Sequence, residues 1–305
     1  MKTVVISGGT GFVGRGLVAR LVARGDAVRI LTRNRTPPEP TDSVTWVTWD
    51  PASPGDWFQA VDGSDAVVHL AGEPAVGVRW TEAVKRRLLE SRVVPAGLLV
   101  DAIQAASKPP GVLISASGIS YYGDTGEPCD EQSPPGPPGA DFLTEVTLAW
   151  EAAAARAEPL GARVVRARLG VVLGPGGGAL SVMAKPFQWF VGGPIGSGDQ
   201  WVSWIHLDDA VGILLACLDS VEVSGPVNVT APSPVPQREL ARTLGRVLGR
   251  PSALKVPAFA LRLRFGQGAT PILTGQPVIP RVMQEHGYAW QHPTLEGALS
   301  AALGR

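Results

Sequence analysis

Three glycines near the start of the chain form the pattern that most constrains its fold. Gly8, Gly11 and Gly14 make up G-x-x-G-x-x-G, directly after a β-branched run and directly before residues with helical spacing. The first glycine of such a turn permits the tight bend, the second lets the backbone approach a pyrophosphate, and the third lets the helix pack closely on the sheet. The free N–H groups that begin the helix then face the anion. Because both flanking elements are present, the pattern predicts a dinucleotide-binding turn and not merely a tight connection.

Strand and helix signals alternate through the first half of the chain. Short β-branched runs predict strands over residues 3–7, 27–31, 44–47, 66–70, 112–115 and 163–168, and apolar residues at helical spacing predict helices over 12–23, 80–106 and 142–157. We expect the long helix over 80–106 to break at Pro95. The alternation predicts an α/β fold, a Rossmann-type doubly wound parallel sheet with helices on both faces.

Glycine-rich segments follow residue 174, and strand signals become sparse there. The patterns beyond it predict helices over 206–218 and 237–248, with an isolated strand over 227–230. We expect a cofactor-binding domain over residues 1–236 and a smaller, mostly helical C-terminal lobe over 237–305. The cleft is expected between them, outside the carboxyl ends of the strands.

Charge and composition exclude several classes of partner. The 27 basic residues balance 27 acidic ones, so no overall field recruits nucleic acid or an anionic membrane. Two cysteines, Cys129 and Cys217, cannot build a disulfide framework and suit a reducing compartment. The longest apolar run, residues 210–218, is too short to cross a bilayer, and the first residues lack the pattern of a secretory peptide. We therefore expect a cytoplasmic protein.

Several other chemistries find no support in the sequence. The histidines show no ligand spacing with the cysteines, so no metal site is expected; they are His69, His206, His286 and His292. No G-x-S-x-G elbow is present, which argues against an α/β-hydrolase triad. No Gly-Lys pair is present, so a Walker A loop is absent.

The end of the second predicted strand indicates which dinucleotide fits. An NAD site would place an acidic residue there for the ribose 2′-hydroxyl. This sequence instead has Thr32 and Arg33, followed by Asn34 and Arg35. A guanidinium binds a 2′-phosphate through two hydrogen bonds, and a neighbouring hydroxyl adds another. NADP(H) is therefore favoured over NAD, the alternative being that Arg33 is only a solvated loop charge.

Several segments resemble the extended short-chain dehydrogenase/reductase superfamily. They are GGTGFVG at residues 8–14, HLAGEP at 69–74, SASGISYYG at 115–123 and RLGVVLGPGGG at 168–178. Others resemble an atypical branch known as epimerase family proteins, or sugar-nucleotide-epimerase-like proteins: WEAA at 150–153, GGPIGSGDQWVSWIHLDD at 192–209 and GPVNVTAP at 225–232. The tail over 277–299 resembles a C-terminal domain of unassigned function. The resemblance covers nearly the whole chain.

This resemblance implies where a nicotinamide dinucleotide would contact the chain. Pyrophosphate contacts fall on the turn, at Gly8, Thr10, Gly11, Phe12, Val13 and Gly14. Leu70 and Ala71, which end the fourth predicted strand, would flank the adenosine ribose and the pyrophosphate. Arg92 in the long helix would lie near the cofactor, and Gly170 and Val172 near the nicotinamide. For Leu70, Ala71 and Val172, ordinary core packing is the alternative.

The chain departs from the superfamily at its acid–base pair. Short-chain dehydrogenases use a tyrosine and a lysine spaced Y-x-x-x-K, in which the ammonium and the cofactor ribose lower the phenol pKa. Y-x-x-x-K occurs nowhere in this sequence. Counting back from Trp150 places Leu143 in the tyrosine position and Thr147 in the lysine position. Neither side chain transfers protons near neutral pH, so the usual mechanism is absent.

What remains is a partial site. Ser117 corresponds best to the substrate-polarising serine, with Ser115 as an alternative. Tyr122 is the one phenol expected near the nicotinamide; it either acts as an acid, if a neighbour lowers its pKa, or packs on the cofactor or over the cleft. Glu145 and Glu151 are expected on solvated or helix-packing faces.

A second group of candidates lies further along the chain. His206, Asp208 and Asp209 match an H-x-D-D stretch that we expect to start a helix and order the cleft wall, in preference to catalysis. Trp201 and Trp204 either line an apolar substrate pocket or pack between the lobes.

Two functions fit these patterns. The first is an NADP-dependent, epimerase- or dehydratase-like oxidoreductase with a non-standard acid–base group. Its substrate would be a small molecule such as a nucleotide sugar or a carbonyl compound. The second is a non-catalytic protein that holds NADP(H) for regulation or redox sensing. Association into a homodimer is compatible with both.

Overall fold

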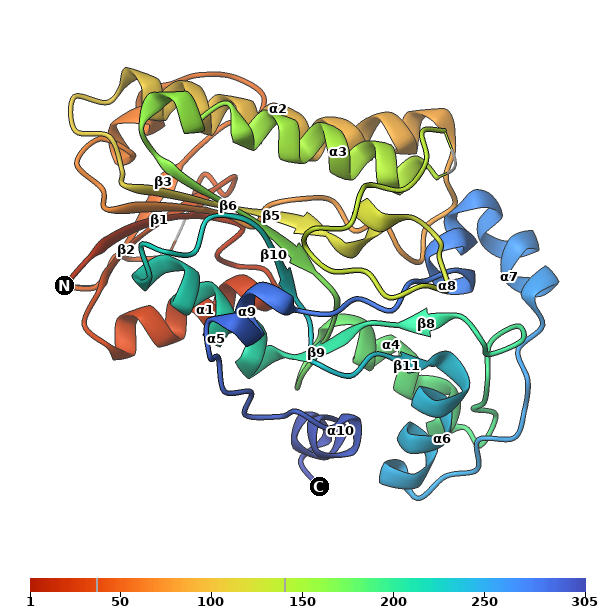
Figure 1. Cartoon of the computed structure of the whole chain (residues 1–305). Coiled ribbons are helices and arrows are strands. Elements are labelled where there is room, and N and C mark those ends of the chain that lie inside the picture. Colours follow the sequence, from red (N-terminus) through yellow and green to blue (C-terminus); the bar gives the residue numbers. More distant parts are fainter. Residues whose placement is uncertain (37, 140) are drawn as a thin grey trace.

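A seven-stranded parallel sheet forms the centre of the molecule (Figure 1). The computed structural model describes residues 1–36, 38–139 and 141–305. The strand order is β10-β6-β5-β4-β1-β2-β3. The strands span Thr3–Ser7 (β1), Ala27–Thr32 (β2), Val44–Thr48 (β3), Ala66–His69 (β4), Val112–Gly118 (β5), Arg163–Leu169 (β6) and Gly225–Val229 (β10). The order reverses at β1, so the Rossmann-type α/β prediction is confirmed.

Helices cover both faces of this sheet. One face packs against α1 (Phe12–Ala23) and α5 (Leu207–Asp219), and the opposite face packs against α2 (Glu82–Ala105) and α3 (Phe142–Ala155). β1 is apolar along its length because both of its faces are covered. Val4 and Ile6 pack into one core, Val5 packs into the other, and all three are fully buried.

Two predictions about secondary structure were wrong. Pro95 does not break the long helix, since α2 continues through it. Pro95 is buried and α2 packs along the length of α3, so tertiary packing outweighs the hydrogen bond that proline cannot donate. The strand near 227–230 is not isolated either. It is β10, which pairs in parallel with β6 at the edge of the main sheet.

A second lobe surrounds a separate hydrophobic core. This core joins α4 (Gly178–Gln188), α6 (Gln237–Leu248) and α10 (Leu295–Leu303) to two short parallel strands, β7 (Val171–Leu173) and β9 (Trp204–His206). The remaining elements of the lobe are β8 (Trp201–Val202), β11 (Val235–Pro236), α7 (Ala258–Phe265), α8 (Thr270–Leu273) and α9 (Arg281–Glu285). The lobe is mostly helical, as expected, and draws on residues from both sides of residue 236.

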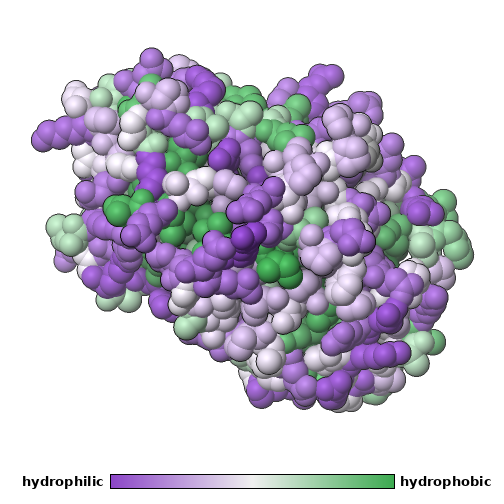
Figure 2. All heavy atoms as spheres, viewed as in Figure 1, coloured by the Kyte–Doolittle hydropathy of each residue, from purple (hydrophilic) through white to green (hydrophobic). Residues whose placement is uncertain are grey.

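Short 3₁₀ turns complete the chain: η1 (Asp56–Ala60), η2 (Ile119–Tyr122), η3 (Glu158–Leu160) and η4 (Gly266–Ala269). Hydrophilic side chains cover much of the face seen in Figure 2, with smaller hydrophobic areas between them. Among the described residues, no helix is long and apolar enough to cross a membrane.

Candidate cofactor and substrate site

The glycine turn has the geometry that its spacing predicts. Gly8 has φ +75°, and a Cβ there would lie 2.7 Å from the backbone nitrogen of Ala71. A Cβ on Gly14 would overlap the carbonyl oxygen of Gly8. Gly11 is the N-cap of α1 and donates its N–H to that same carbonyl at 2.9 Å. Since the N-cap residue has no side chain, the first N–H groups of α1 stay free for an anion, so a diphosphate fits here.

The other turn residues divide between solvent and core. Thr10 is exposed, whereas Val13 packs against the core under α1. The ring of Phe12 packs against a glycine-rich stretch, where a Cβ on Gly177 or Gly178 would come within 3.0 Å of it. The Phe12 side chain therefore fixes the turn against the second lobe, while its backbone remains at the start of α1.

β2 ends beside the turn and places two of the predicted phosphate contacts there. Thr32 is half-buried, and its hydroxyl accepts a hydrogen bond from the Asn34 N–H at 3.1 Å. Its own hydroxyl proton remains available to a ligand. Arg33 follows it and is exposed.

β4 ends next to Gly8, and its following residues are held by Arg92. The Leu70 N–H donates to the Ser7 carbonyl at 3.0 Å, which extends the sheet beneath the turn. The Arg92 guanidinium donates to the carbonyls of Glu73 at 2.7 Å and Leu88 at 2.9 Å. It thereby ties α2 to the segment after β4. The turn is thus bordered by Leu70, Ala71 and Arg92. Contacts between these residues and a cofactor remain predictions.

His69 lies fully buried at the end of β4. Its Nδ1 lies 2.6 Å from the Ser7 hydroxyl, so these side chains join β4 to β1 directly under the turn. Burial, with a smaller contribution from the charge of Arg92, lowers the pKa of His69 from 6.5 to about 4.

We expect this histidine to make the fold sensitive to acid. Folded His69 stays neutral down to about pH 4, whereas in the unfolded chain it takes up a proton near pH 6.5. Between these values the unfolded state binds more protons, so the free energy of unfolding falls as the pH is lowered. Melting temperatures measured from pH 7 to pH 4.5 should fall less steeply in His69→Asn, which keeps a polar partner for Ser7. His286→Asn, at an exposed position, serves as the control. An unchanged slope in His69→Asn would contradict this role.

The segment after β6 carries the two residues expected near the nicotinamide. A Cβ on Gly170 would lie 2.6 Å from the Ser203 carbonyl oxygen, so a glycine is required for the two lobes to meet here. Val172 pairs with Ile205 of β9 and packs against the core beneath α1 and α5. Gly170 lies at the carboxyl edge of the sheet, where the nicotinamide is expected. For Val172, the observed packing agrees with the alternative of an ordinary core residue.

Of the two expected acid–base positions, Leu143 has an apolar side chain, and Thr147 carries a hydroxyl that pairs with Ser120. The Thr147 hydroxyl donates to the Leu143 carbonyl at 2.6 Å and lies 2.9 Å from the Ser120 hydroxyl. Thr144 donates to the Ser120 carbonyl at 2.8 Å. These bonds bind α3 to η2. Ser120 was not among the predicted site residues; its signal was its place in the SASGISYYG segment, opposite the helix that carries the missing pair.

Glu151 is buried and paired, so of the two expected alternatives, a solvated or a packing face of the helix, the packing face holds. Arg168 donates to both of its carboxylate oxygens, at 2.8 and 2.9 Å, and both side chains are less than 10% exposed. Ser117 donates to the same carboxylate at 2.6 Å. Burial alone would lower the pKa of Arg168, but the hydrogen bonds and charges of Glu151 and Tyr122 outweigh it and raise the pKa. The guanidinium therefore remains charged.

Tyr122 belongs to the same network. Its hydroxyl donates to Asn228 at 2.7 Å and accepts from Arg168 at 2.9 Å. Burial raises its pKa, and the charge of Arg168 only partly offsets that effect. An acid–base role required a lowered pKa, so the geometry opposes it. Ser117 and Tyr122 both serve to join β5, β6, β10 and α3.

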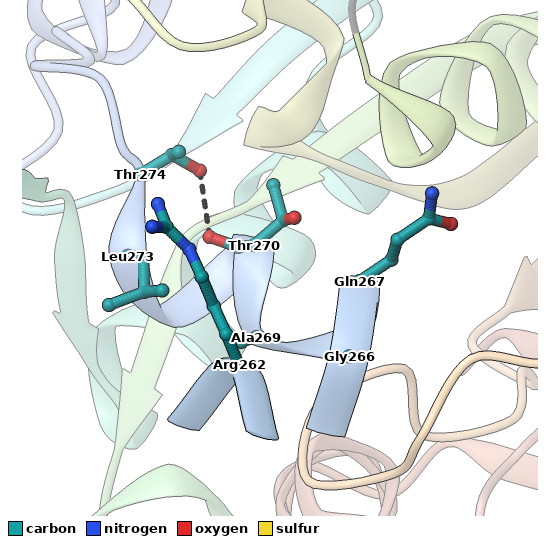
Figure 3. Close-up of a pocket in the computed structure, with 7 residues that line it drawn as sticks. All are labelled: Arg262, Gly266, Gln267, Ala269, Thr270, Leu273 and Thr274. Carbon is teal, nitrogen blue, oxygen red and sulfur yellow. Dashed lines mark hydrogen bonds between the residues drawn. The ribbon is translucent and has the colours of Figure 1, made fainter. Parts of the chain in front are cut away.

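Two adjoining cavities share Gln267 and Thr270: one lies between helices α2 and α3 and the C-terminal lobe, and the other lies within the segment from α7 to α8. The first, of about 310 Å³, is lined by Trp80, Lys85, Gly139, Asp141, Phe142, Glu145, Gln267 and Thr270. The second, of about 290 Å³ and shown in Figure 3, is lined by Arg262, Gly266, Gln267, Ala269, Thr270, Leu273 and Thr274. Neither includes the glycine turn. The first is lined by Asp141 and Phe142 at the start of α3, directly before Leu143, which occupies the usual tyrosine position.

The first cavity combines an aromatic wall with ionisable groups. The rings of Trp80 and Phe142 meet edge to face with centroids 5.3 Å apart. Burial raises the pKa of Asp141, and the charges of Asp124 and Glu145 raise it further. The Asp141 carboxyl therefore holds a proton to a higher pH than an ordinary aspartate does.

The H-x-D-D stretch starts a helix, as predicted. His206 is the N-cap of α5, and its Nδ1 accepts from the Asp208 N–H at 3.2 Å. Asp209 is fully buried and accepts the backbone N–H groups of Gln291 and His292 at 2.7 and 2.9 Å. It therefore fastens the C-terminal segment to α5. Trp204 is fully buried in the core of the second lobe, which leaves packing as its role.

Comparison with known proteins identifies the family. Residues 4–230 match the model of the NAD dependent epimerase/dehydratase family. The chain belongs to this family. Residues 256–302 of this epimerase/dehydratase family member match a domain of unknown function, DUF1731. The resemblance found in the sequence motifs is thereby confirmed, including the unassigned C-terminal domain.

Relatives of this family member span nearly its whole length. It is 42% identical over 308 residues to an Arabidopsis thaliana protein, "Epimerase family protein SDR39U1 homolog, chloroplastic", covering 99% of this chain and 86% of that one. A crystal structure of human epimerase family protein SDR39U1 (isoform 2) with NADPH superposes with a TM-score of 0.87 and 37% identity, covering 99% of both chains. The Corynebacterium glutamicum nucleoside-diphosphate sugar epimerase has a TM-score of 0.80 and 32% identity over 99% of this chain and 58% of its own.

Proposed function

We propose that this protein binds NADPH at the glycine turn and uses it as an epimerase- or dehydratase-like oxidoreductase. The observation that carries the proposal is the turn itself: an uncapped helix N-terminus, packed against the end of β4, with Arg33 exposed at the end of the neighbouring strand. The human relative crystallised with NADPH supports the choice of cofactor.

Each part of the site has a separate task. The N–H groups of the turn bind the diphosphate, and Arg33 with the Thr32 hydroxyl binds the 2′-phosphate through charge-assisted hydrogen bonds. Arg92 holds the segment after β4 in place beside them. When bound, the nicotinamide supplies or accepts hydride at its C4. The chain itself contributes position, exclusion of water and the movement of a proton.

The substrate is proposed to enter the cavity at the start of α3. Trp80 and Phe142 offer apolar faces, while Lys85, Gln267 and Thr270 offer hydrogen bonds, a combination suited to a polar small molecule with an apolar face such as a sugar. Asp141, with its raised pKa, is the group in this cavity best suited to donate a proton. A nucleotide sugar or a small carbonyl compound is the substrate class.

A non-catalytic role in holding NADPH is the second candidate. One observation favours it: the hydroxyls of Ser117 and Tyr122 are both committed to the Arg168 network, and Leu143 occupies the usual tyrosine position. In that case the cavity would be a recognition site whose occupancy depends on the cofactor.

Arg33→Ala tests the cofactor site. Removing this guanidinium should weaken NADPH binding by about 10- to 100-fold, because a hydrogen-bonded charge contributes about 1.5–3 kcal/mol. NADH lacks the 2′-phosphate, so its affinity should change little. Arg35→Ala, which removes another exposed arginine two residues further along the same loop, is the matched control. Isothermal titration of each variant with both dinucleotides gives the four affinities. Equal losses for NADPH and NADH in Arg33→Ala would contradict the assignment.

Turnover separates the two candidate functions. Protein loaded with NADPH or NADP⁺ is incubated with a panel of nucleotide sugars and small carbonyl compounds while nicotinamide absorbance is followed. Products are also analysed chromatographically, because an epimerase regenerates its cofactor in each cycle. Any product whose formation requires the cofactor supports the enzyme. Tight NADPH binding without any product across the panel favours the binding protein.

A further inference from the structure

Two histidines and an aspartate meet where α5 begins. His206 ends β9 and caps α5, Asp208 lies in the first turn of that helix, and His292 comes from the segment that leads into α10. Spacing in the sequence does not reveal this group, because His292 lies far along the chain from the other two. The fold brings their side chains together at the junction of the two lobes.

The Asp208 carboxylate lies at the ligand spacing of a tetrahedral metal site from each of the two histidines. The Asp208 Oδ2 lies 3.4 Å from the His206 Nδ1 and 3.4 Å from the His292 Nε2. All three ligand atoms lie within 4.8 Å of one another. Zinc bonds of about 2.0–2.2 Å in tetrahedral geometry separate neighbouring ligand atoms by about 3.3–3.5 Å. Both measured separations equal this edge length.

The side chains are held in place by the surrounding structure. The His206 side chain is only 3% exposed, so the packing around it restricts the orientation of the ring, and its Nε2 has no hydrogen-bond partner among the described residues. Asp209 fixes the backbone of His292 by accepting its N–H at 2.9 Å. Two of the three ligands are therefore positioned before any ion arrives, which lowers the entropy cost of binding.

Access and charge also suit a bound cation. Asp208 is about half exposed, at 51%, and His292 is 21% exposed, so an ion can enter from solvent and keep a water molecule as a fourth ligand. Two neutral imidazoles and one carboxylate are the donor set that zinc uses in many proteins. The 3.2 Å bond from the Asp208 N–H to the His206 Nδ1 is long, and a metal bond at that nitrogen would replace it.

We propose that His206, Asp208 and His292 bind one zinc ion in a tetrahedral site completed by water. The ion would join α5, which packs against the helix of the cofactor turn, to the C-terminal segment that Asp209 already holds. Its role would therefore be structural, linking the DUF1731 region to the dinucleotide-binding domain. This site is independent of the substrate cavity.

Metal content and thermal stability test the proposal. Full-length protein with its affinity tag removed is purified from zinc-supplemented cells, and the metal is quantified by mass spectrometry. We expect about one zinc per chain, and zinc added to chelator-treated protein should raise the melting temperature by roughly 5 °C. Magnesium should have no effect, because imidazole nitrogens are poor ligands for it. Cobalt in place of zinc should give the intense visible absorption of a four-coordinate ion.

Variants locate the ion. His292→Ala and Asp208→Asn should each weaken zinc binding by at least about 100-fold, since each removes one of three protein ligands. His286→Ala, which removes an exposed histidine from the same region, should leave zinc binding unchanged. Circular dichroism and NADPH affinity confirm that the variants fold. The proposal would be overturned if the purified protein held no zinc and its melting temperature did not respond to added zinc. It would also be overturned if His292→Ala bound zinc as tightly as the unmodified protein, which would leave an ordinary histidine–aspartate ion pair.

Discussion

Glu151→Ala is expected to lower the free energy of unfolding by about 3–5 kcal/mol, because it leaves Arg168 charged and unpaired inside the protein. Arg168 is 3% exposed and donates two hydrogen bonds to this carboxylate, which also accepts one from the Ser117 hydroxyl. Removing the carboxylate leaves donors in both side chains unsatisfied. The loss should be seen in denaturant unfolding followed by circular dichroism.

The same helix supplies a control for this prediction. Glu145→Ala removes an exposed carboxylate from the first turn of α3, so it should change stability by less than about 1 kcal/mol. Replacing Glu151 and Arg168 together by apolar residues should recover part of the loss, because no unpaired charge then remains. Comparable stabilities for Glu151→Ala and Glu145→Ala would show that the buried network does not stabilise the junction of β5, β6 and α3.

Gly14→Ala is expected to weaken NADPH binding by at least about 100-fold. Its new Cβ would overlap the Gly8 carbonyl oxygen and lie 2.8 Å from the Gly9 Cα, so the start of α1 must move away from the turn. The N–H groups that are proposed to bind the diphosphate would move with it. Charge-assisted hydrogen bonds contribute about 1.5–3 kcal/mol each, and more than one is affected.

Gly9→Ala tests whether the effect comes from the turn geometry or from any added methyl group. The atoms nearest to a Cβ on Gly9 all belong to the side chain of Ile30, the first 3.0 Å away, and that side chain can shift. NADPH affinity should therefore fall by less than about tenfold in Gly9→Ala. Melting curves of both variants separate lost binding from lost folding. Similar NADPH affinities in the folded Gly14→Ala and Gly9→Ala proteins would contradict the proposed site.

The parts of the fold predicted from sequence depend on local physics. The turn at Gly8 to Gly14 has a glycine spacing that few other structures require. The strands and helices that alternate around it differ in the spacing of their apolar residues, which the sequence shows directly. The start of α5 was also predictable, since an aspartate-rich first turn favours a helix N-terminus. Local patterns of this kind need no knowledge of what packs against them.

The failures arose where distant residues meet. Pro95 lies inside α2 because packing against α3 outweighs its local preference. For Glu151 the sequence left a solvated and a packing face open, and only the position of Arg168 on β6 reveals that it is buried and paired. Likewise β10 became an edge strand of the main sheet through pairing with β6. Long-range partners of this kind leave no periodic signal in one sequence.

The dinucleotide that the unmodified protein prefers tests the proposed cofactor site most directly. Isothermal titration of the purified, full-length chain with NADPH and with NADH, in the same buffer and at the same salt concentration, measures that preference. We expect binding of one NADPH per chain, at least about tenfold tighter than NADH, because the Arg33 guanidinium is proposed to contact the 2′-phosphate. Equal affinities for the two dinucleotides, or no binding of either, would contradict the account.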